Sequence, residues 1–177
     1  MTERQAAPRF VRAAQNDPVA APLLAELAAE YAERYGGSER ALLDGMQSYP
    51  AQEFAPPDGG LIVGVSADGT PVTGGAFRRF GDVEGEPTAE LKRIWTARRW
   101  RRQGLATAMM AELEEEIRRR GYRRIYLMTG DRQPEAERLY ESLGYVRLEA
   151  PLPASGPVYP IAFAKSVPQP VTQEVEL

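Results

Sequence analysis

The spacing of apolar residues in the first third of the chain predicts two helices. The longer one covers residues 21–35 and would end at Gly36. Its apolar stripe consists of Leu23, Leu24, Leu27, Ala28 and Tyr31. A shorter helix is predicted over residues 38–47, with Ser38 as its N-cap. The chain therefore begins with a helical lead-in.

Apolar and small residues dominate residues 59–80, in a pattern typical of strands. Asp68-Gly69 divides this segment and is a strong hairpin signal, so two antiparallel strands are expected. A third strand is predicted over residues 88–96, after a polar hairpin loop at 81–87. These strands together form an antiparallel meander.

The second half of the chain predicts helices that alternate with strands. An amphipathic helix is expected over residues 105–120, and Gly121 would end it. Its outer face places Glu114, Glu115 and Glu116 four residues before Arg118, Arg119 and Arg120, which is typical of a solvated face with paired charges. The remaining predicted elements are a strand at 123–129, a helix at 134–144, and strands at 145–150 and 161–165.

The resulting order, β-β-β-α-β-α-β with a last strand, predicts a mixed α/β (α+β) fold. One domain over residues 1–166 and a polar tail over 167–177 account for the chain of 177 residues. No apolar run is long enough to cross a membrane, and the N-terminus lacks the apolar core of a signal peptide. A cytoplasmic protein with no membrane partner is therefore expected.

The composition limits the chemistry that the chain can perform. The formal net charge is −3, which argues against a dedicated nucleic-acid binder. Cysteine and histidine are both absent, so thiolates and imidazoles cannot bind a metal, and no metal is expected. Proton transfer near neutral pH must use a carboxylate, tyrosine, lysine, an amine or water.

A cluster of arginines stands directly before the helix at 105–120, in the segment RRWRRQGLATAMM at residues 98–110. A strand that runs through a glycine into a helix leaves unpaired amides at a positive helix end, here from Gln103 to Thr107. Gly104 allows a ligand to approach the backbone closely. The segment therefore predicts a phosphate-binding loop. The alternative for Arg98, Arg99 and Arg102 is a solubilising surface loop.

This segment resembles the GNAT superfamily of N-acetyltransferases, whose signature [QR]-x-x-G-x-[GA] is matched by Arg101-x-x-Gly104-x-Ala106. The motif A-x-x-L-Y-x-x-x-G-Y, which ends at Tyr145, extends the resemblance over about residues 71–145. The resemblance implies the acyl-CoA N-acyltransferase fold. In that fold, about four helices flank a mostly antiparallel sheet, and splayed strands form the acetyl-CoA cleft.

The resemblance also implies acetyl-CoA as cosubstrate, with its pyrophosphate on the amides of the loop and its pantetheine along the preceding strand. The implied binding residues are Ile94, Trp95, Thr96, Arg101, Arg102, Gln103, Gly104, Leu105, Ala106, Thr107, Gln133 and Tyr140. A backbone amide near Ile94 would polarise the thioester carbonyl at a strand bulge. The chain departs from the family at Gln133, where many members have Asn, and at Arg98, where Pro is frequent.

Two residues are candidates for catalysis. The resemblance marks Tyr140 as proton donor to the sulfur of coenzyme A, although helical spacing alone would also explain a packing tyrosine. Glu90 lies where some relatives place a general base. The alternative for Glu90 is a strand carboxylate that pairs with Lys92 or Arg78.

These inferences predict an N-acetyltransferase for a primary amine of a small molecule or peptide; the alternative is a coenzyme A sensor without turnover. An RNA-directed enzyme would require a wider basic groove. The acceptor groove is expected around Tyr31, Tyr35, the loop at 81–87 and residues 153–160. Acidic Asp82, Glu84 and Glu86 could attract a cationic amine, or could simply be solvated. A second copy could pair with the sheet edge at 158–165.

Overall fold

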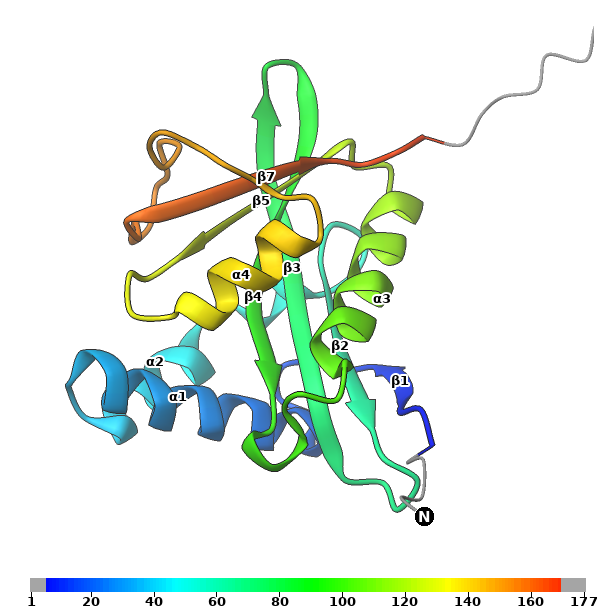
Figure 1. The fold of residues 1–177 in the computed structure, drawn as a ribbon, viewed down its shortest axis with the longest axis vertical. Coiled ribbons are helices and arrows are strands. Elements are labelled where there is room, and N and C mark those ends of the chain that lie inside the picture. The colour runs from blue at the N-terminus through cyan, green and yellow to red at the C-terminus, as the bar shows by residue number, and fades with distance from the viewer. Residues whose placement is uncertain (1–5, 170–177) are drawn as a thin grey trace, which may run out of the picture.

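The computed structural model describes residues 6–169 and contains one seven-stranded sheet with helices on both faces (Figure 1). The strand order is β1-β2-β3-β4-β5-β7-β6, and all neighbours are antiparallel except the parallel pair β4 and β5. The strands are β1 Arg9–Arg12, β2 Gly60–Val65, β3 Pro71–Val83, β4 Glu86–Thr96, β5 Arg124–Thr129, β6 Val146–Arg147 and β7 Ile161–Ser166. The predicted mixed, mostly antiparallel fold is confirmed.

Four α-helices connect these strands: α1 Ala21–Tyr35, α2 Glu39–Ser48, α3 Leu105–Arg119 and α4 Pro134–Ser142. Short 3₁₀ turns are η1 Pro18–Ala20, η2 Ala51–Phe54 and η3 Arg98–Trp100. Ser38 caps α2 as predicted, because its hydroxyl accepts a hydrogen bond from the amide of Ala41 at 3.2 Å. Within residues 6–169, no helix has the length and apolar character that a membrane span requires.

The helices form two layers because α1, α3 and α4 bury apolar residues against one face of the sheet or the other. On one face, α3 and α4 cover the core residues Phe77, Leu91, Met109, Leu113, Ile117, Ile125, Tyr140 and Phe163. On the opposite face, α1 packs Leu23, Leu24 and Leu27 against Trp95. Next to it, Phe54 packs with Leu61, Val63 and Ala76. The sheet thus separates the α3 face from the α1 face.

The predicted hairpin loop at 81–87 is wrong, because strands continue through most of it. β3 extends to Val83, β4 begins at Glu86, and only Glu84 and Gly85 form the turn, with φ of 52° and 78°. Two residues with positive φ match the twist of antiparallel strands. Two of the three acidic side chains at 81–87 are paired, since Asp82 lies 3.4 Å from Arg79 and Glu84 lies 3.5 Å from Arg124.

The two edges of the sheet also differ from the predictions. Strand β1 was not predicted, and it pairs with the outer edge of β2. The predicted strand at 145–150 is shorter, covering Val146 and Arg147 alone. The last strand, β7, lies between β5 and β6, so β6 covers part of the edge that was expected to be open. At the start of the predicted tail Val167 is buried, whereas residues 170–177 lie outside the described residues.

The charged face of α3 is only partly solvated. The predicted pairs Glu115–Arg119 and Glu116–Arg120 are present at 3.3 and 3.0 Å. Glu116 is only 7% exposed, however, and it also binds Arg12 of β1 at 2.5 Å. Glu114 does not pair with Arg118, because it accepts hydrogen bonds from Lys165 and Tyr145 instead. These carboxylates tie α3 to the sheet.

Strands β4 and β5 diverge, as the family resemblance implied (Figure 1). They pair only where residues 88–90 meet residues 124–126, so β4 has no β5 partner from Leu91 onward. A bulge in β4 places Arg93 and Ile94 opposite the single residue Gly75. Arg93 has a φ of 60°, which is unusual for a residue other than glycine.

Candidate functional site

The N-terminus of α3 presents backbone donors that the chain does not use. Gly104 is the N-cap, in the left-handed region with φ of 77°, and no side chain caps this helix end. The first helical hydrogen bond runs from the amide of Ala108 to the carbonyl of Gly104 at 3.1 Å. The amides of Gln103–Thr107 donate no hydrogen bond to any residue in the described part of the chain. Such donors at a positive helix end are suited to bind an anion.

Open space borders this loop at Gly104. A Cβ atom added there would meet no other atom within 4 Å, so packing within the chain does not require glycine. The left-handed conformation does favour glycine, because other L-residues are strained there. Leu105 is buried and anchors the first turn of the helix to the core. A rigid helix end thus faces open space.

The arginine cluster before the helix has two parts, and the first part holds α1. The amide of Arg98 donates to Glu26 at 2.8 Å, and its guanidinium lies 3.1 Å from Glu33. Arg101 forms an ion pair with Glu30, and its Nε donates to the carbonyl of Thr96 at 3.1 Å. These paired side chains fix the loop against the acidic edge of α1.

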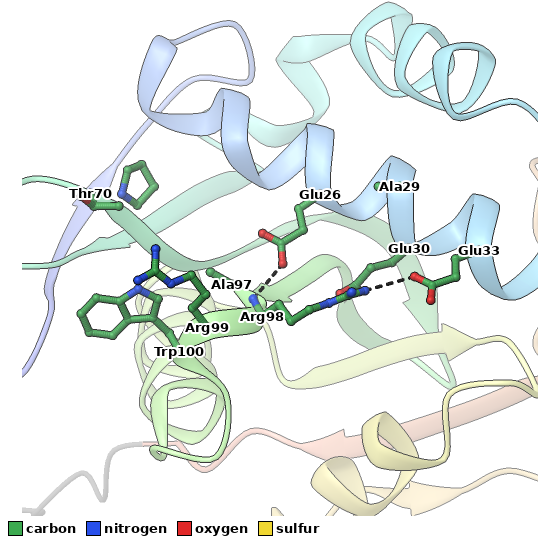
Figure 2. A pocket seen from close by; sticks show the side chains of 10 residues that line it. Glu26, Ala29, Glu30, Glu33, Thr70, Ala97, Arg98, Arg99 and Trp100 are labelled. Carbon is green, nitrogen blue, oxygen red and sulfur yellow. Dashed lines mark hydrogen bonds and ion pairs between the residues drawn. The ribbon is translucent and has the colours of Figure 1, made fainter.

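The second part of the cluster consists of Arg99 and Arg102, which form no ion pair with a described residue. Arg102 is exposed, with φ of 62°, directly before the unused amides. Arg99 points toward a hollow of about 500 Å³ between α1 and η3 (Figure 2). Residues 103–107 do not line this hollow, so it lies beside the row of amides rather than over it.

Tyr140 on α4 is 7% exposed, and its ring packs against Tyr145 and Phe163 with centroids 5.9 and 5.8 Å away. Its hydroxyl makes no hydrogen bond with a described residue, whereas Tyr145 donates to Glu114 at 2.8 Å. Burial raises the pKa of Tyr140, and the nearby Tyr31 contributes further. This phenol therefore stays protonated at neutral pH, and its role as proton donor stays a prediction.

Glu90 on β4 is 1% exposed, and cations bind both of its carboxylate oxygens. Oε2 lies 3.0 Å from Arg78, and Oε1 lies 2.9 Å from Lys92. Arg78 also lies 3.5 Å from Glu53 of η2. This arrangement supports the alternative in which Glu90 joins β3 and β4, and its role as a general base stays a prediction.

The side chains of the β4 segment face the two cores. Ile94 packs with the α3 face, and Trp95 is buried on the α1 face against Leu23 and Leu24. The hydroxyl of Thr96 lies 3.2 Å from that of Thr73. A ligand that runs along β4 at this point would therefore meet mainly backbone.

The end of α1 contacts the start of α4. Gln133 donates from Nε2 to the hydroxyl of Tyr35 at 3.3 Å, and the amide of Arg132 donates to the same oxygen at 3.2 Å. Gly130 permits this approach, because a Cβ there would lie 2.0 Å from the Tyr35 hydroxyl. The fold thus brings Gln133 and Tyr35 together, and their side chains form a hydrogen bond with each other.

Sequence reasoning missed Arg93, whose side chain lies among residues of α2, of η2 and of two loops on the α1 face. Its guanidinium donates to Oε1 of Gln15 at 2.7 Å and to the carbonyl of Met46 at 2.9 Å. It also covers the rings of Tyr49 and Phe54, at 5.5 and 4.8 Å from their centroids. Two consecutive cations, Lys92 and Arg93, were the available signal, but the bulge that directs Arg93 could not be predicted from the sequence.

A splayed β4–β5 pair, a bulge in β4 and an uncapped helix after it define the architecture of acyl-CoA N-acyltransferases. The sequence profile of the acetyltransferase (GNAT) family matches residues 22–145, which is more than half of the chain. The chain belongs to this family, whose members use acetyl-CoA and an acceptor substrate.

Individual relatives agree with this assignment. An acetyltransferase of the GNAT family from Staphylococcus aureus superposes with a TM-score of 0.73 at 12% identity, covering 90% of this chain and all of the other. An aminoglycoside 6'-N-acetyltransferase complexed with coenzyme A gives a TM-score of 0.64 at 20% identity, covering 92% of this chain and 99% of the other. At such identities the likeness concerns the fold.

A sequence relative is the aminoglycoside N(6')-acetyltransferase type 1 of Serratia marcescens. It is 32% identical over an alignment of 85 residues, and the match covers 42% of this chain and 58% of the relative. The matched part therefore spans less than two thirds of that relative's length.

Proposed function

We propose that this chain is an acetyl-CoA-dependent N-acetyltransferase that transfers the acetyl group directly to a primary amine of a small molecule or peptide. The observation that carries the proposal is the row of unused amides at Gln103–Thr107, in a family that uses acetyl-CoA. Both named aminoglycoside relatives modify an amino group, which supports an amine acceptor.

The loop would hold the diphosphate of the donor. The amides of residues 103–107 supply hydrogen bonds, and the positive end of α3 adds a favourable field. Each charge-assisted hydrogen bond contributes about 1.5–3 kcal/mol, so three of them would supply a large part of the about 8 kcal/mol that micromolar binding requires. Exposed Arg102 adds attraction at longer range. The backbone of β4 from Ile94 to Thr96 would line the pantetheine arm.

The donor supplies an acetyl group that is activated as a thioester. A backbone amide at the β4 bulge near Ile94 would polarise the thioester carbonyl. Tyr140 would give its proton to the departing sulfur, because its hydroxyl has no other described partner and its raised pKa keeps it protonated until the sulfur leaves. The acceptor amine must arrive unprotonated, either from solution or through Glu90 and water.

The direct test is a thiol-release assay on the purified chain with acetyl-CoA and a panel of primary amines. We expect release that depends on the amine, and mass spectrometry should find the acetylated amine. If coenzyme A binds while no amine in a broad panel raises the release rate, the sensor alternative replaces this proposal.

A further inference from the structure

The bulge in β4 places two consecutive cations on the same face of the sheet. Regular alternation would direct Arg93 to the α3 face, together with Leu91. Instead, Lys92 lies 2.9 Å from Glu90 on the α1 face, and Arg93 contacts Gln15 and Met46 on that face too. In this arrangement Arg93 has a positive φ, which is a strained backbone conformation for a residue other than glycine.

The charged side chains around Glu90 and Arg93 are not all paired. The buried carboxylate of Glu90 binds Arg78 and Lys92, and Glu53 lies near Arg78. No described carboxylate lies within ion-pair distance of Arg93. Among these five side chains there are three cations and two anions, and Arg93 is the cation with no described anion within ion-pair distance.

The Arg93 guanidinium is held in place by neutral groups. Its two hydrogen bonds use only part of the five N–H donors of a guanidinium, and two aromatic rings restrict its motion. Desolvation lowers the pKa of Arg93, because neutral neighbours do not offset its loss of water. A planar cation with spare donors is suited to bind a carboxylate.

Arg93 also lies close to the proposed reaction centre. It stands in the part of β4 that has no β5 partner, where the two strands diverge. Its partner Met46 packs in the same cluster as Tyr31. Tyr31 in turn lies close enough to Tyr140 to raise its pKa. Tyr31 is therefore a shared neighbour of Arg93 and of Tyr140, the candidate proton donor.

We infer that Arg93 binds a carboxylate of the acceptor, so that the enzyme prefers primary amines that carry a carboxylate over neutral or polycationic amines. This inference rests on the proposed function and makes its acceptor more specific. An aminoglycoside, with several cationic amines and no carboxylate, would meet an unmatched positive charge on this face.

The test compares amino acids with their primary amides, for example 4-aminobutyrate with 4-aminobutyramide and L-lysine with L-lysinamide. We expect the wild-type kcat/KM to be at least about tenfold higher for the acid in each pair that reacts, the usual effect of one charge-assisted hydrogen bond. In Arg93→Gln this ratio should fall to about one, with the KM for acetyl-CoA unchanged.

Two further variants separate recognition from folding. Lys92→Gln removes the neighbouring charge from the same face and should keep the preference for the acid. Arg93→Lys keeps the charge and loses the planar fork, so it should retain only part of the preference, and it replaces the Gln variant if that one does not fold. A merely structural Arg93 would lower activity with acid and amide equally.

The failures of the two proposals can be told apart. If wild type acetylates amides as well as acids, or if the preference survives in Arg93→Gln, the role of Arg93 is overturned and the acetyltransferase proposal stands. If no amine raises thiol release although coenzyme A binds, both proposals are overturned.

Discussion

The loop before α3 and the ionic network around Glu90 are both rich in charge, yet their hydrogen bonding is opposite. In the loop, five successive amides from Gln103 to Thr107 have no described acceptor. At Glu90, both oxygens have a cation within 3.0 Å. Folding thus leaves the donors of the loop without partners in the described part of the chain, whereas it pairs both carboxylate oxygens of Glu90.

This difference separates binding groups from structural ones. Polar groups in a folded chain are nearly always satisfied by the chain or by water, so an exposed row of donors that the chain does not use is available to a ligand. A carboxylate that is already paired on both oxygens has less capacity to accept a proton from substrate. The same contrast divides Arg102, which is exposed, from Arg98, which binds Glu26 and Glu33.

The largest effect is expected from Gly104→Glu, which adds bulk and negative charge at the unused amides. We expect coenzyme A affinity to fall by at least about 100-fold in calorimetry, since two or more charge-assisted hydrogen bonds are lost. Gly121→Glu is the matched control at the other end of α3. Gly121 is also left-handed and borders open space, so this variant shares the backbone strain. Equal affinity in both variants would contradict the loop assignment.

Tyr140→Phe should lower kcat by about 100-fold, the usual size of a lost general acid, with little change in acetyl-CoA affinity. Stability should hardly change, because the Tyr140 hydroxyl has no described partner. Since burial raises its pKa, wild-type kcat should persist above the ordinary tyrosine pKa of about 10 before the donor is lost. Tyr145→Phe, which loses a hydrogen bond to Glu114, should instead affect stability more than turnover. A fully active Tyr140→Phe would exclude the donor role.

Glu90→Gln tests the ionic network around Glu90. The variant should lower the free energy of unfolding by about 3 kcal/mol, because Arg78 and Lys92 lose a buried partner. Denaturant titration measures this change. Turnover should change by less than about threefold from pH 6 to 9 if Glu90 is structural. A drop of tenfold or more that depends on pH would restore Glu90 as the general base.

The smallest effect is expected from Arg102→Gln. It should weaken coenzyme A binding by about two- to fivefold at low salt, as is usual for an exposed charge, and the difference should shrink at high salt. Arg98→Gln removes the same charge from the same loop, but its side chain is paired with α1 and should leave affinity unchanged. An equal loss in both variants would mean that only net charge matters.

The features that the sequence predicted correctly are local. Apolar spacing gave α1 and α3, Ser38 gave a cap, and the signature at Arg101 and Gly104 gave the family and the site of the loop. Each of these signals lies within a few residues of the feature that it predicts.

The features that the sequence did not reveal depend on distant segments. The partners of Arg98 and Arg101 lie more than 60 positions away on α1. Strand β1 exists because it pairs with β2, since its four residues alone have little pattern. The direction of Arg93 depends on the register of β3 against β4, which no single segment encodes.

The central claim is that the backbone at the start of α3 binds the diphosphate of coenzyme A. An NMR titration of the ¹⁵N-labelled chain with coenzyme A tests it most directly. The account predicts that the largest, saturable shifts occur at the amides of Gly104, Leu105, Ala106 and Thr107. Saturation elsewhere with these four resonances unmoved, or no saturation at millimolar coenzyme A, would contradict it.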